Sequence, residues 1–134
     1  MTTNAETWLQ NFLRDHGGVA GTVHVRQGDD LVMTAAMNIP PKVVEVTRHI
    51  PNGKGMAGLA LLRDQPVQTC NLKDDNSGDV RPGAKAVNAN AAVALPVHDG
   101  GGQVRAVVGI AFMGEREIPA EELARLSKAA EALP

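Results

Sequence analysis

The sequence predicts an α+β fold in which an antiparallel β-sheet carries the first and last helices on one face and short helices plus a long loop on the other. Two observations predict the sheet: alternating apolar residues form a hairpin pattern over 19–37 and a second one over 92–113. A third observation, an amphipathic helix pattern at each end of the chain, predicts two outer helices that bury apolar stripes against the sheet. At 134 residues, the chain fits one domain over 1–134.

Residues 3–15 predict the first helix. Thr3 and Glu6 have the spacing of a capping box, in which each side chain hydrogen-bonds an otherwise unpaired backbone amide at the start of the helix. The two glycines after His16 end the helix, since glycine adopts the left-handed cap conformation at little steric cost. The apolar stripe of this helix consists of Trp8, Leu9, Phe12 and Leu13.

The first hairpin joins strands at 19–27 and 31–37 through a Gly-Asp-Asp turn. In the first strand Val23 and Val25 alternate with polar residues, which is the pattern of a strand with one buried face. The polar positions of this strand are Thr22, His24 and Arg26. The residues expected to share one face of the second strand are Leu31, Met33, Ala35 and Met37.

The middle of the chain predicts short helices, turns and one long loop. The Pro40-Pro41 pair opens a short helix through about residue 47, because proline is tolerated at the first helical position. A glycine-rich turn over 50–58 leads into a second short helix over 59–63 and a brief strand over 66–70. Residues 71–90 are polar, and a loop of this length inside a compact domain is usually functional or disordered.

A second hairpin and a helix complete the predicted fold. Strands at 92–97 and 104–113 flank a glycine-rich turn, and Pro119 begins the last helix. Glu121 and Glu122 lie in the first turn of this helix, where the helix dipole favours negative charge. The apolar stripe of the last helix consists of Leu123, Leu126, Ala130 and Leu133.

Charge and cysteine content exclude several classes of function. Thirteen Lys and Arg against fifteen Asp and Glu give a net charge of -2, so no basic field is available to hold nucleic acid. A single cysteine excludes an intramolecular disulfide and a zinc site built from cysteine clusters. No signal sequence stands out, and the longest charge-free apolar stretch is far short of the roughly 18–20 residues of a membrane span. We therefore expect a soluble, cytoplasmic protein with no nucleic-acid or membrane partner.

Several local motifs, taken in order, resemble a GAF domain over nearly the whole chain. The glycine-rich segment resembles the family's IP-x-G-x-G-x-x-G motif, and a hairpin of the type xxPL…DGxxxGVL follows later in the sequence. The segments that carry the resemblance are 50–58, 65–67, 94–97, 99–100, 108–110 and 119–123. The resemblance implies small-molecule sensing, dimerisation within signalling proteins and, in a few members, covalent chromophore binding or redox catalysis.

One enzymatic branch of that family, the free methionine-(R)-sulfoxide reductases, resembles the chain but carries residues that this chain lacks. The resemblance puts Val87 where those enzymes have their catalytic cysteine, and Ala57 where they have a recycling cysteine. It puts Ala92, Gly109 and Ala111 where they have acids that bind the substrate. Because attack on a sulfoxide requires a thiolate, we expect no such catalysis. The lone Cys70 is expected to be a small buried apolar residue.

Other motifs favour neither a cofactor nor a metal. Gly53, Gly55 and Gly58 match a dinucleotide fingerprint, with an acidic pair about twenty residues on, but the following loop and antiparallel hairpin do not continue a Rossmann unit. The acidic run from residue 74 lacks the glycine and glutamate that a calcium loop needs at its sixth and twelfth places. The four histidines show no ligand spacing and are expected at the surface or at strand edges: His16, His24, His49 and His98.

The polar loop over 71–90 is the candidate ligand-binding segment, since the GAF resemblance implies that it closes over a pocket on the sheet. Charged groups of both signs above an apolar floor would suit a small zwitterion or a polar metabolite; a solvated surface loop is the alternative. The candidate polar residues are Asp74, Asp75, Asp79, Arg81, Lys85, Asn88 and Asn90. The candidate floor residues are Leu31 and Met33, with Val93. The small residues Ala91, Ala92, Ala94 and Ala111 either leave room for a ligand or allow close packing of helices.

The resulting hypothesis is a non-catalytic GAF module that senses an unidentified small molecule. The terminal helices carry more apolar residues than one narrow stripe needs, so we expect a homodimer formed through them. No output domain is evident, so the signal would pass to a separate signalling protein, unless the chain is a fragment. Two alternatives stay open: a dimerisation scaffold whose pocket has collapsed, and a redox enzyme related to the sulfoxide reductases.

Overall fold

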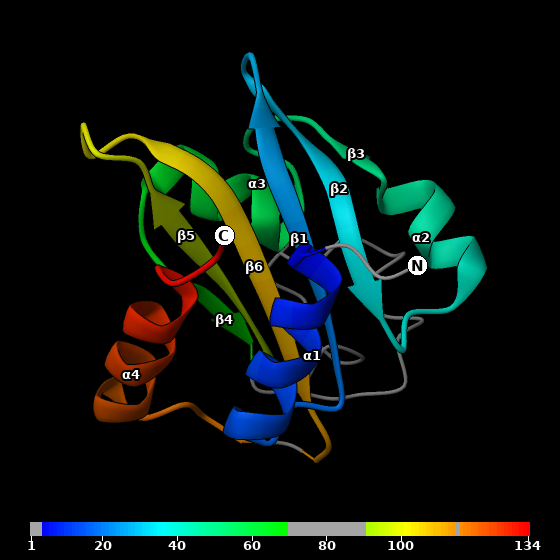
Figure 1. The fold of residues 1–134 in the computed structure, drawn as a ribbon, viewed down its shortest axis with the longest axis vertical. Coiled ribbons are helices and arrows are strands. Elements are labelled where there is room, and N and C mark those ends of the chain that lie inside the picture. Colours follow the sequence, from blue (N-terminus) through cyan, green and yellow to red (C-terminus); the bar gives the residue numbers. More distant parts are fainter. Residues whose placement is uncertain (1–3, 70–90, 115) are drawn as a thin grey trace.

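The computed structural model describes residues 4–69, 91–114 and 116–134, and these form a six-stranded sheet flanked by four helices (Figure 1). The strands are β1 (Ala20–Gln27), β2 (Asp30–Met37), β3 (His49–Ile50), β4 (Val67–Thr69), β5 (Ala91–His98) and β6 (Val104–Phe112). The helices are α1 (Asn4–His16), α2 (Pro41–Thr47), α3 (Gly55–Arg63) and α4 (Ala120–Ala130). The predicted α+β class with an antiparallel sheet is confirmed.

The strand order β3-β2-β1-β6-β5-β4 places the two hairpins side by side. β1 pairs with β6 in the centre of the sheet, and every pairing among the described strands is antiparallel. The first and last strands of the two hairpins therefore make one continuous surface, although they lie more than 70 residues apart in the sequence.

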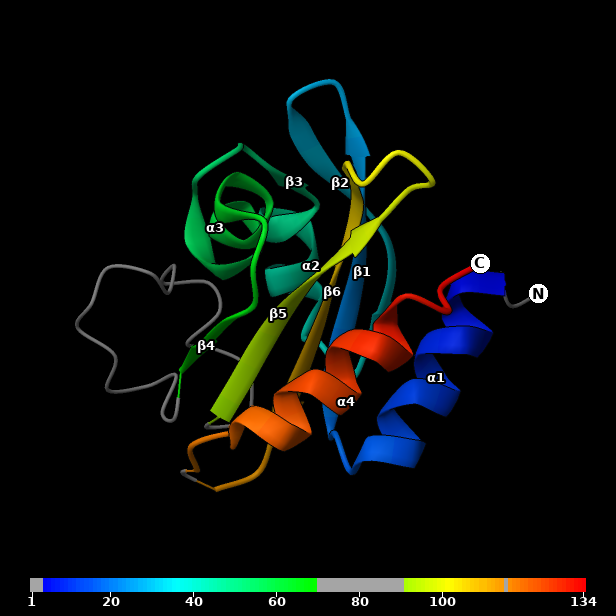
Figure 2. The same ribbon diagram turned by 90° about the vertical axis from the view of Figure 1, so that its left-hand side faces the viewer.

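Helices α1 and α4 cover one face of the sheet, and α2 and α3 cover the other (Figure 2). Each outer helix points its predicted stripe at the strands, because those residues are the ones with most apolar area to bury. The core on the α1/α4 face includes Leu9 and Phe12 from α1, Leu126 from α4, Leu133 just after α4, and Val23, Leu95, Val108 and Ile110 from the strands. This face is filled by large side chains with almost no solvent exposure.

The face covered by α2 and α3 is packed by two smaller clusters. Under α3 the cluster includes Leu31, Ile50, Leu61 and Val107. Under α2, Val43 packs with Ala20 and Ala111, and Ile39 and Ala92 lie against them. The short β3 and the first turn of α3, beginning at Gly55, were not predicted, since the glycine-rich segment was expected to be a turn up to residue 58.

A β-bulge in the first hairpin corrects one sequence prediction. Val23 pairs with Ala35, but the next residue, His24, pairs with Met33, so Thr34 is an extra residue in β2. The bulge reverses the alternation within β2: Ala35 packs in the core under α1, whereas Leu31 packs in the cluster under α3. The prediction that Leu31, Met33, Ala35 and Met37 share one face is therefore wrong, because it assumed an unbroken period of two.

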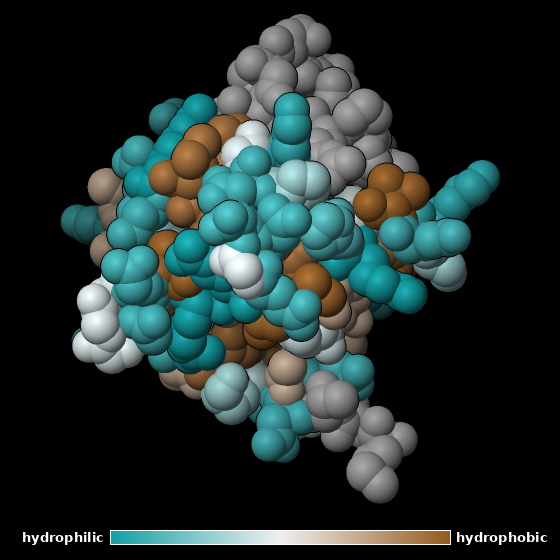
Figure 3. Space-filling model, turned by 90° about the horizontal axis from the view of Figure 1, so that it is seen from above, coloured by the Kyte–Doolittle hydropathy of each residue, from teal (hydrophilic) through white to brown (hydrophobic). Residues whose placement is uncertain are grey.

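The described surface offers no broad apolar patch. Its exposed large apolar side chains lie in separate places: Val46 on α2, Leu62 on α3 and Met113 directly after β6. Seen from above, the molecule is mainly hydrophilic, with apolar residues in separate small areas (Figure 3). None of the described helices has the length and apolarity that crossing a membrane requires.

Candidate functional site

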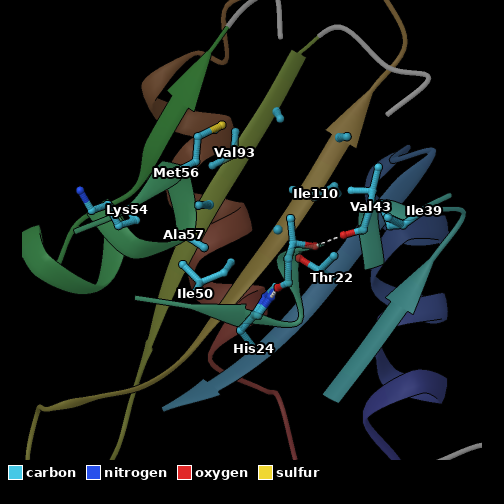
Figure 4. Close-up of a pocket in the computed structure, with 17 residues that line it drawn as sticks. Thr22, His24, Ile39, Val43, Ile50, Lys54, Met56, Ala57, Val93 and Ile110 are labelled. Atoms are coloured by element: carbon cyan, nitrogen blue, oxygen red, sulfur yellow. Dashed lines mark hydrogen bonds between the residues drawn. The ribbon is translucent and has the colours of Figure 1, made fainter. Parts of the chain in front are cut away.

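A cavity of about 140 Å³ lies between the sheet and helices α2 and α3 (Figure 4). Its floor comes from the three central strands β1, β5 and β6, and its walls come from α2, the start of α3 and Ile50 of β3. The cavity is the principal candidate site among the described residues, because it is concave, largely apolar and carries a few polar groups, as small-molecule sites do.

Small residues on β5 and β6 create the space. Ala92 pairs with Ala111, and Ala94 pairs with Gly109, so these four positions form a patch of small side chains on the face toward α2 and α3. A Cβ atom added to Gly109 would lie 2.9 Å from Thr22 Oγ1. The sequence left open whether its small residues make room or allow close packing. Ala92, Ala94 and Ala111 line the cavity, and Ala94 and Ala111 also pack in the clusters under α3 and α2. Ala91 instead is fully buried in the core on the other face.

The walls of the cavity are apolar. Val43 and Ile39 approach from the α2 side, and Ile50, Met56 and Ala57 from the β3 and α3 side (Figure 4). Lys54 is the single charged side chain among the described lining residues, but it is exposed, and its ammonium group points away from the other labelled side chains (Figure 4).

The glycines at the edge of the cavity are required by the local backbone conformation and by close packing. Gly53 and Gly55 have φ values of 82° and 66°, which other residues rarely adopt. At Gly58 an added Cβ would lie 2.7 Å from the carbonyl oxygen of Pro51. The pattern that matches a dinucleotide fingerprint is thus required by a sharp turn into α3 and by close packing.

His24 supplies a buried titratable group to the cavity. Its side chain lies on β1, lines the cavity and is only 2% exposed. Its Nε2 lies 2.8 Å from the backbone carbonyl oxygen of Thr47, at the end of α2 (dashed line in Figure 4). Burial lowers the pKa of His24 and outweighs this hydrogen bond, which acts in the opposite direction. The ring is therefore neutral near pH 7.

The other ring nitrogen of His24, Nδ1, is left without a proton. A carbonyl oxygen can only accept, so Nε2 carries the proton and Nδ1 of the neutral ring is an acceptor. Nδ1 is buried and has no hydrogen-bond partner among the described residues. A buried acceptor without a donor costs about 1–3 kcal/mol, so this arrangement of His24 lowers the stability of the fold.

The prediction that every histidine lies at the surface or at a strand edge is wrong for His24. The alternation in β1 placed His24 with Thr22 on the polar face of the strand. In the structure α2 and the start of α3 cover that face. The signal that could have revealed this is the apolar content of the covering segments, where Val43 and Ile50 need a surface on which to pack.

The structure tests little of the predicted ligand-binding set. Its seven polar members lie outside the described residues: Asp74, Asp75, Asp79, Arg81, Lys85, Asn88 and Asn90, as does Cys70. Leu31 and Met33 lie on the same sheet face as the cavity, since Met33 pairs with His24. Leu31 is fully buried under α3, and neither residue is among those that line the cavity. Val93 does line it.

A second cluster of titratable groups lies at the end of β5. His98 Nε2 lies 2.5 Å from Asp64 Oδ1, just after α3, and His98 Nδ1 lies 3.1 Å from Glu131 Oε2, just after α4. Since both carboxylates accept, both ring nitrogens donate, and hydrogen bonds first to Asp64 and then to Glu131 raise the pKa of His98. The described residues contain no group of three or more side chains that could hold a metal ion.

The antiparallel sheet, the paired outer helices and the cavity under the inner helices define a domain of the α+β class with a cavity on one face of its sheet. A family model described as "GAF domain" matches residues 5–133. The chain belongs to the GAF domain family, as the sequence resemblance implied.

Solved structures share this fold at low sequence identity. Type II free methionine-R-sulfoxide reductase from Thermoplasma acidophilum matches with a TM-score of 0.77 and 16% identity, over 96% of this chain and 85% of that one. The GAF domain from Acinetobacter phosphoenolpyruvate-protein phosphotransferase matches with a TM-score of 0.76 and 12% identity, over 99% and 81%. Free methionine-R-sulfoxide reductase from Neisseria meningitidis, in complex with its substrate, matches with a TM-score of 0.67 and 17% identity, over 92% and 75%. Comparison with curated proteins gave no match.

Proposed function

We propose that this GAF domain is a non-catalytic sensor that binds a small molecule in the cavity between the sheet and helices α2 and α3. The cavity itself carries the proposal: small residues on β5 and β6 leave a space of about 140 Å³ between the sheet and the inner helices. A concave, largely apolar space with a few polar groups is the kind of site in which small molecules bind.

The lining of the cavity supports binding without chemistry. Ala57, Ala92, Gly109 and Ala111, which the resemblance matches to cysteine and acidic positions of the sulfoxide reductases, all line this cavity. The described lining residues include no cysteine, aspartate or glutamate. The described lining therefore holds no thiolate that could begin an attack on a sulfoxide sulfur.

The proposed signal would run from the cavity to the outer helices through shared strands. Ala92 and Ala94 of β5 contribute to the cavity, while their neighbours Ala91 and Leu95 pack in the core under α1 and α4. Interior packing is dense, so a ligand that moves β5 also moves the residues on its other face. The output partner in this proposal is a separate signalling protein in the cytoplasm.

Homodimer formation through α1 and α4 remains part of the proposal. The residues that suggested surplus apolar surface, such as Leu9, Phe12 and Leu126, are buried against the sheet of the same subunit. A dimer would therefore use the partly buried margin of the helices, where Trp8 and Leu123 lie. Light scattering measures this directly, and a monomer at high concentration would remove the dimer while leaving the sensor.

A methyl NMR screen of small fragments tests the proposed site. We expect some fragments to shift the methyl resonances of Val43, Ile50 and Met56, and not those of Leu9 on the other face. Filling the cavity by Ala92→Leu should abolish these shifts. The same exchange at the exposed Ala124 of α4 is the matched control and should leave them unchanged.

Two results would contradict the proposed function. A broad screen in which no fragment reaches the cavity methyls would remove the binding site. Reduction of free methionine sulfoxide by the purified protein with a thiol reductant would show that it is an enzyme. The alternative of a scaffold with a collapsed pocket gains no support from the described part of the chain, where the pocket is open.

A further inference from the structure

The surface that lines the cavity gives it a chemical preference. The part of this surface that the described residues form is almost entirely apolar. We propose that the ligand is a compact, uncharged molecule with a hydrocarbon body on the scale of a single ring, and not the zwitterion or polar metabolite that the sequence suggested. This inference rests on the proposed function, since it names the class of ligand for the same cavity.

Apolar side chains reach the cavity from both helices that cover it and from the edge of the sheet. Val43 comes from α2, Met56 and Ala57 come from the start of α3, and Ile50 comes from β3 (Figure 4). The small residues of β5 and β6 form the floor beneath them. A ligand with an apolar body removes this surface from water, which contributes about 25 cal/mol for each Å² that is buried.

The polar side chains between α2 and β1 hydrogen-bond to the protein itself. The hydroxyl of Thr47 donates to the carbonyl oxygen of Val43 over 2.6 Å, and Nε2 of His24 donates to the carbonyl oxygen of Thr47 over 2.8 Å. Nδ1 of His24 has almost no accessible surface, so a molecule in the cavity does not touch it. Thr47 and His24 therefore line the cavity but offer a ligand no hydrogen-bond donor.

The described lining also places no charge against a ligand. Lys54 is exposed, and its ammonium group points away from the other labelled side chains (Figure 4). The ring of His24 is neutral near pH 7, because burial lowers its pKa. Thr22 adds one uncharged hydroxyl, whose oxygen lies beside Gly109. Since burying an ion without a partner is costly, an ionic ligand should bind more weakly than an uncharged one of the same shape.

The volume sets the size of the ligand. The cavity holds about 140 Å³, and an apolar cavity of about 150 Å³ in another protein accepts benzene. A single ring is thus the right scale for the described space. Benzene derivatives with short substituents are therefore the probes for a test.

The test compares probes of nearly equal shape that differ in charge. Ethylbenzene and benzylammonium form one pair, and isopropylbenzene and benzoate form the pair for a negative charge. We expect both hydrocarbons to shift the methyl resonances of Val43 and Ile50 and not those of Leu9 on the other face. Calorimetry on the intact protein at pH 7 should show each ion binding at least about tenfold more weakly than its hydrocarbon partner.

A polar substitution in the lining tests the same preference from the side of the protein. Met56→Gln replaces a thioether by an amide of similar size, and Met56 is only partly buried, so the fold should tolerate the change. Ethylbenzene should then bind at least about fivefold more weakly, because its binding removes the amide from water. Met113→Gln makes the same exchange at a residue that is 61% exposed and outside the cavity lining, and it should keep the wild-type affinity.

The outcomes separate this inference from the proposed function. If an ionic probe shifts the cavity methyls and binds as tightly as its hydrocarbon partner, the ligand class is wrong and the binding site stands. An unchanged affinity for ethylbenzene in Met56→Gln has the same meaning. If no probe shifts the cavity methyls at millimolar concentration, both the ligand class and the proposed site are contradicted. The comparison of probes needs only the wild-type protein, so it decides the question even if Met56→Gln does not fold.

Discussion

On one face of the sheet, α1 and α4 pack leucines and a phenylalanine onto valines and an isoleucine with almost no solvent exposure. On the other face, α2 and α3 cover alanines and a glycine, and a cavity lies between them and the sheet. Both faces are built from the same strands, since successive residues of β5 and β6 point to opposite sides. The difference teaches that the size of every second residue, rather than the fold, decides which face is solid. Ala91 and Ala92, one residue apart, belong to the two different faces.

The largest effect expected from this comparison follows from removing a large side chain on the solid face. Leu126 of α4 is fully buried in the core under α1 and α4, so Leu126→Ala should lower the free energy of unfolding by about 2–5 kcal/mol. Met56 lines the cavity on the other face and is only partly buried, so Met56→Ala removes less buried area and should cost about 1 kcal/mol. Urea unfolding of both variants measures the difference. Equal losses would mean that the two faces are equally well packed.

The second prediction concerns substitutions that enlarge a side chain instead of shortening it. Ala91→Leu forces three more carbon atoms into the solid core and should cost about 1–3 kcal/mol, as overpacking does. Ala92→Leu places the same atoms in the cavity and should change stability by less than about 1 kcal/mol, because the space already exists. Thermal unfolding of the two variants compares them under one condition. A severe loss in Ala92→Leu would show that the space is not available to a side chain.

The sequence predicted the fold well because its signals are local and repeated. The outer helices follow from stripes such as Leu9 and Phe12, and the hairpins follow from alternation around turns. Two features could not be predicted because they depend on how the strands pair with one another. The bulge at Thr34 changes the face of half of β2, and no residue type announces it. The register that sets Ala94 beside Gly109, and so opens the cavity, comes from the meeting of two strands.

The histidines show that the sequence was equally limited in predicting the residues of the candidate site. In the sequence His24 and His98 look alike, since both follow a valine in a predicted strand or its end. Burial is what separates them: one is covered by α2 and α3, and the other lies at the end of β5 between two carboxylates. The alternation in β1 identified two faces, and the predicted fold put helices over both, but neither told which polar side chains those helices would bury.

Lowering the pH should reduce the free energy of unfolding because His24 is buried. The pKa of His24 is lowered by burial, and in the unfolded chain it returns to about 6.5. Between these two values the unfolded state binds more protons, so the free energy of unfolding falls as pH drops below about 6.5, by at most about 1.4 kcal/mol per pH unit. Above pH 6.5 this contribution vanishes. Urea unfolding at pH 7.5 and 5.0 should show a smaller acid loss in His24→Gln than in the wild type.

The smallest expected effect concerns the contact that links the two layers. His98 joins Asp64, after α3 on the cavity side, to Glu131, after α4 on the solid side. Its pKa is raised, so the folded state binds the extra proton: the stabilisation is full below about pH 6.5 and is lost as pH rises through the pKa of the folded state. Because the three side chains are partly exposed, His98→Gln should cost at most about 1 kcal/mol at pH 6 and less at pH 9.

The substitution Asp64→Asn tests the charge of this contact while keeping the local backbone conformation. Asp64 has a φ of 51°, a conformation that asparagine also adopts readily, so the exchange removes the carboxylate with little change to the turn. If the protonated ring links the layers, His98→Gln and Asp64→Asn should each reduce stability at pH 6, and the double variant should cost less than their sum. Additive losses would mean that the two residues act separately, and the solid and hollow faces would then be joined through the sheet alone.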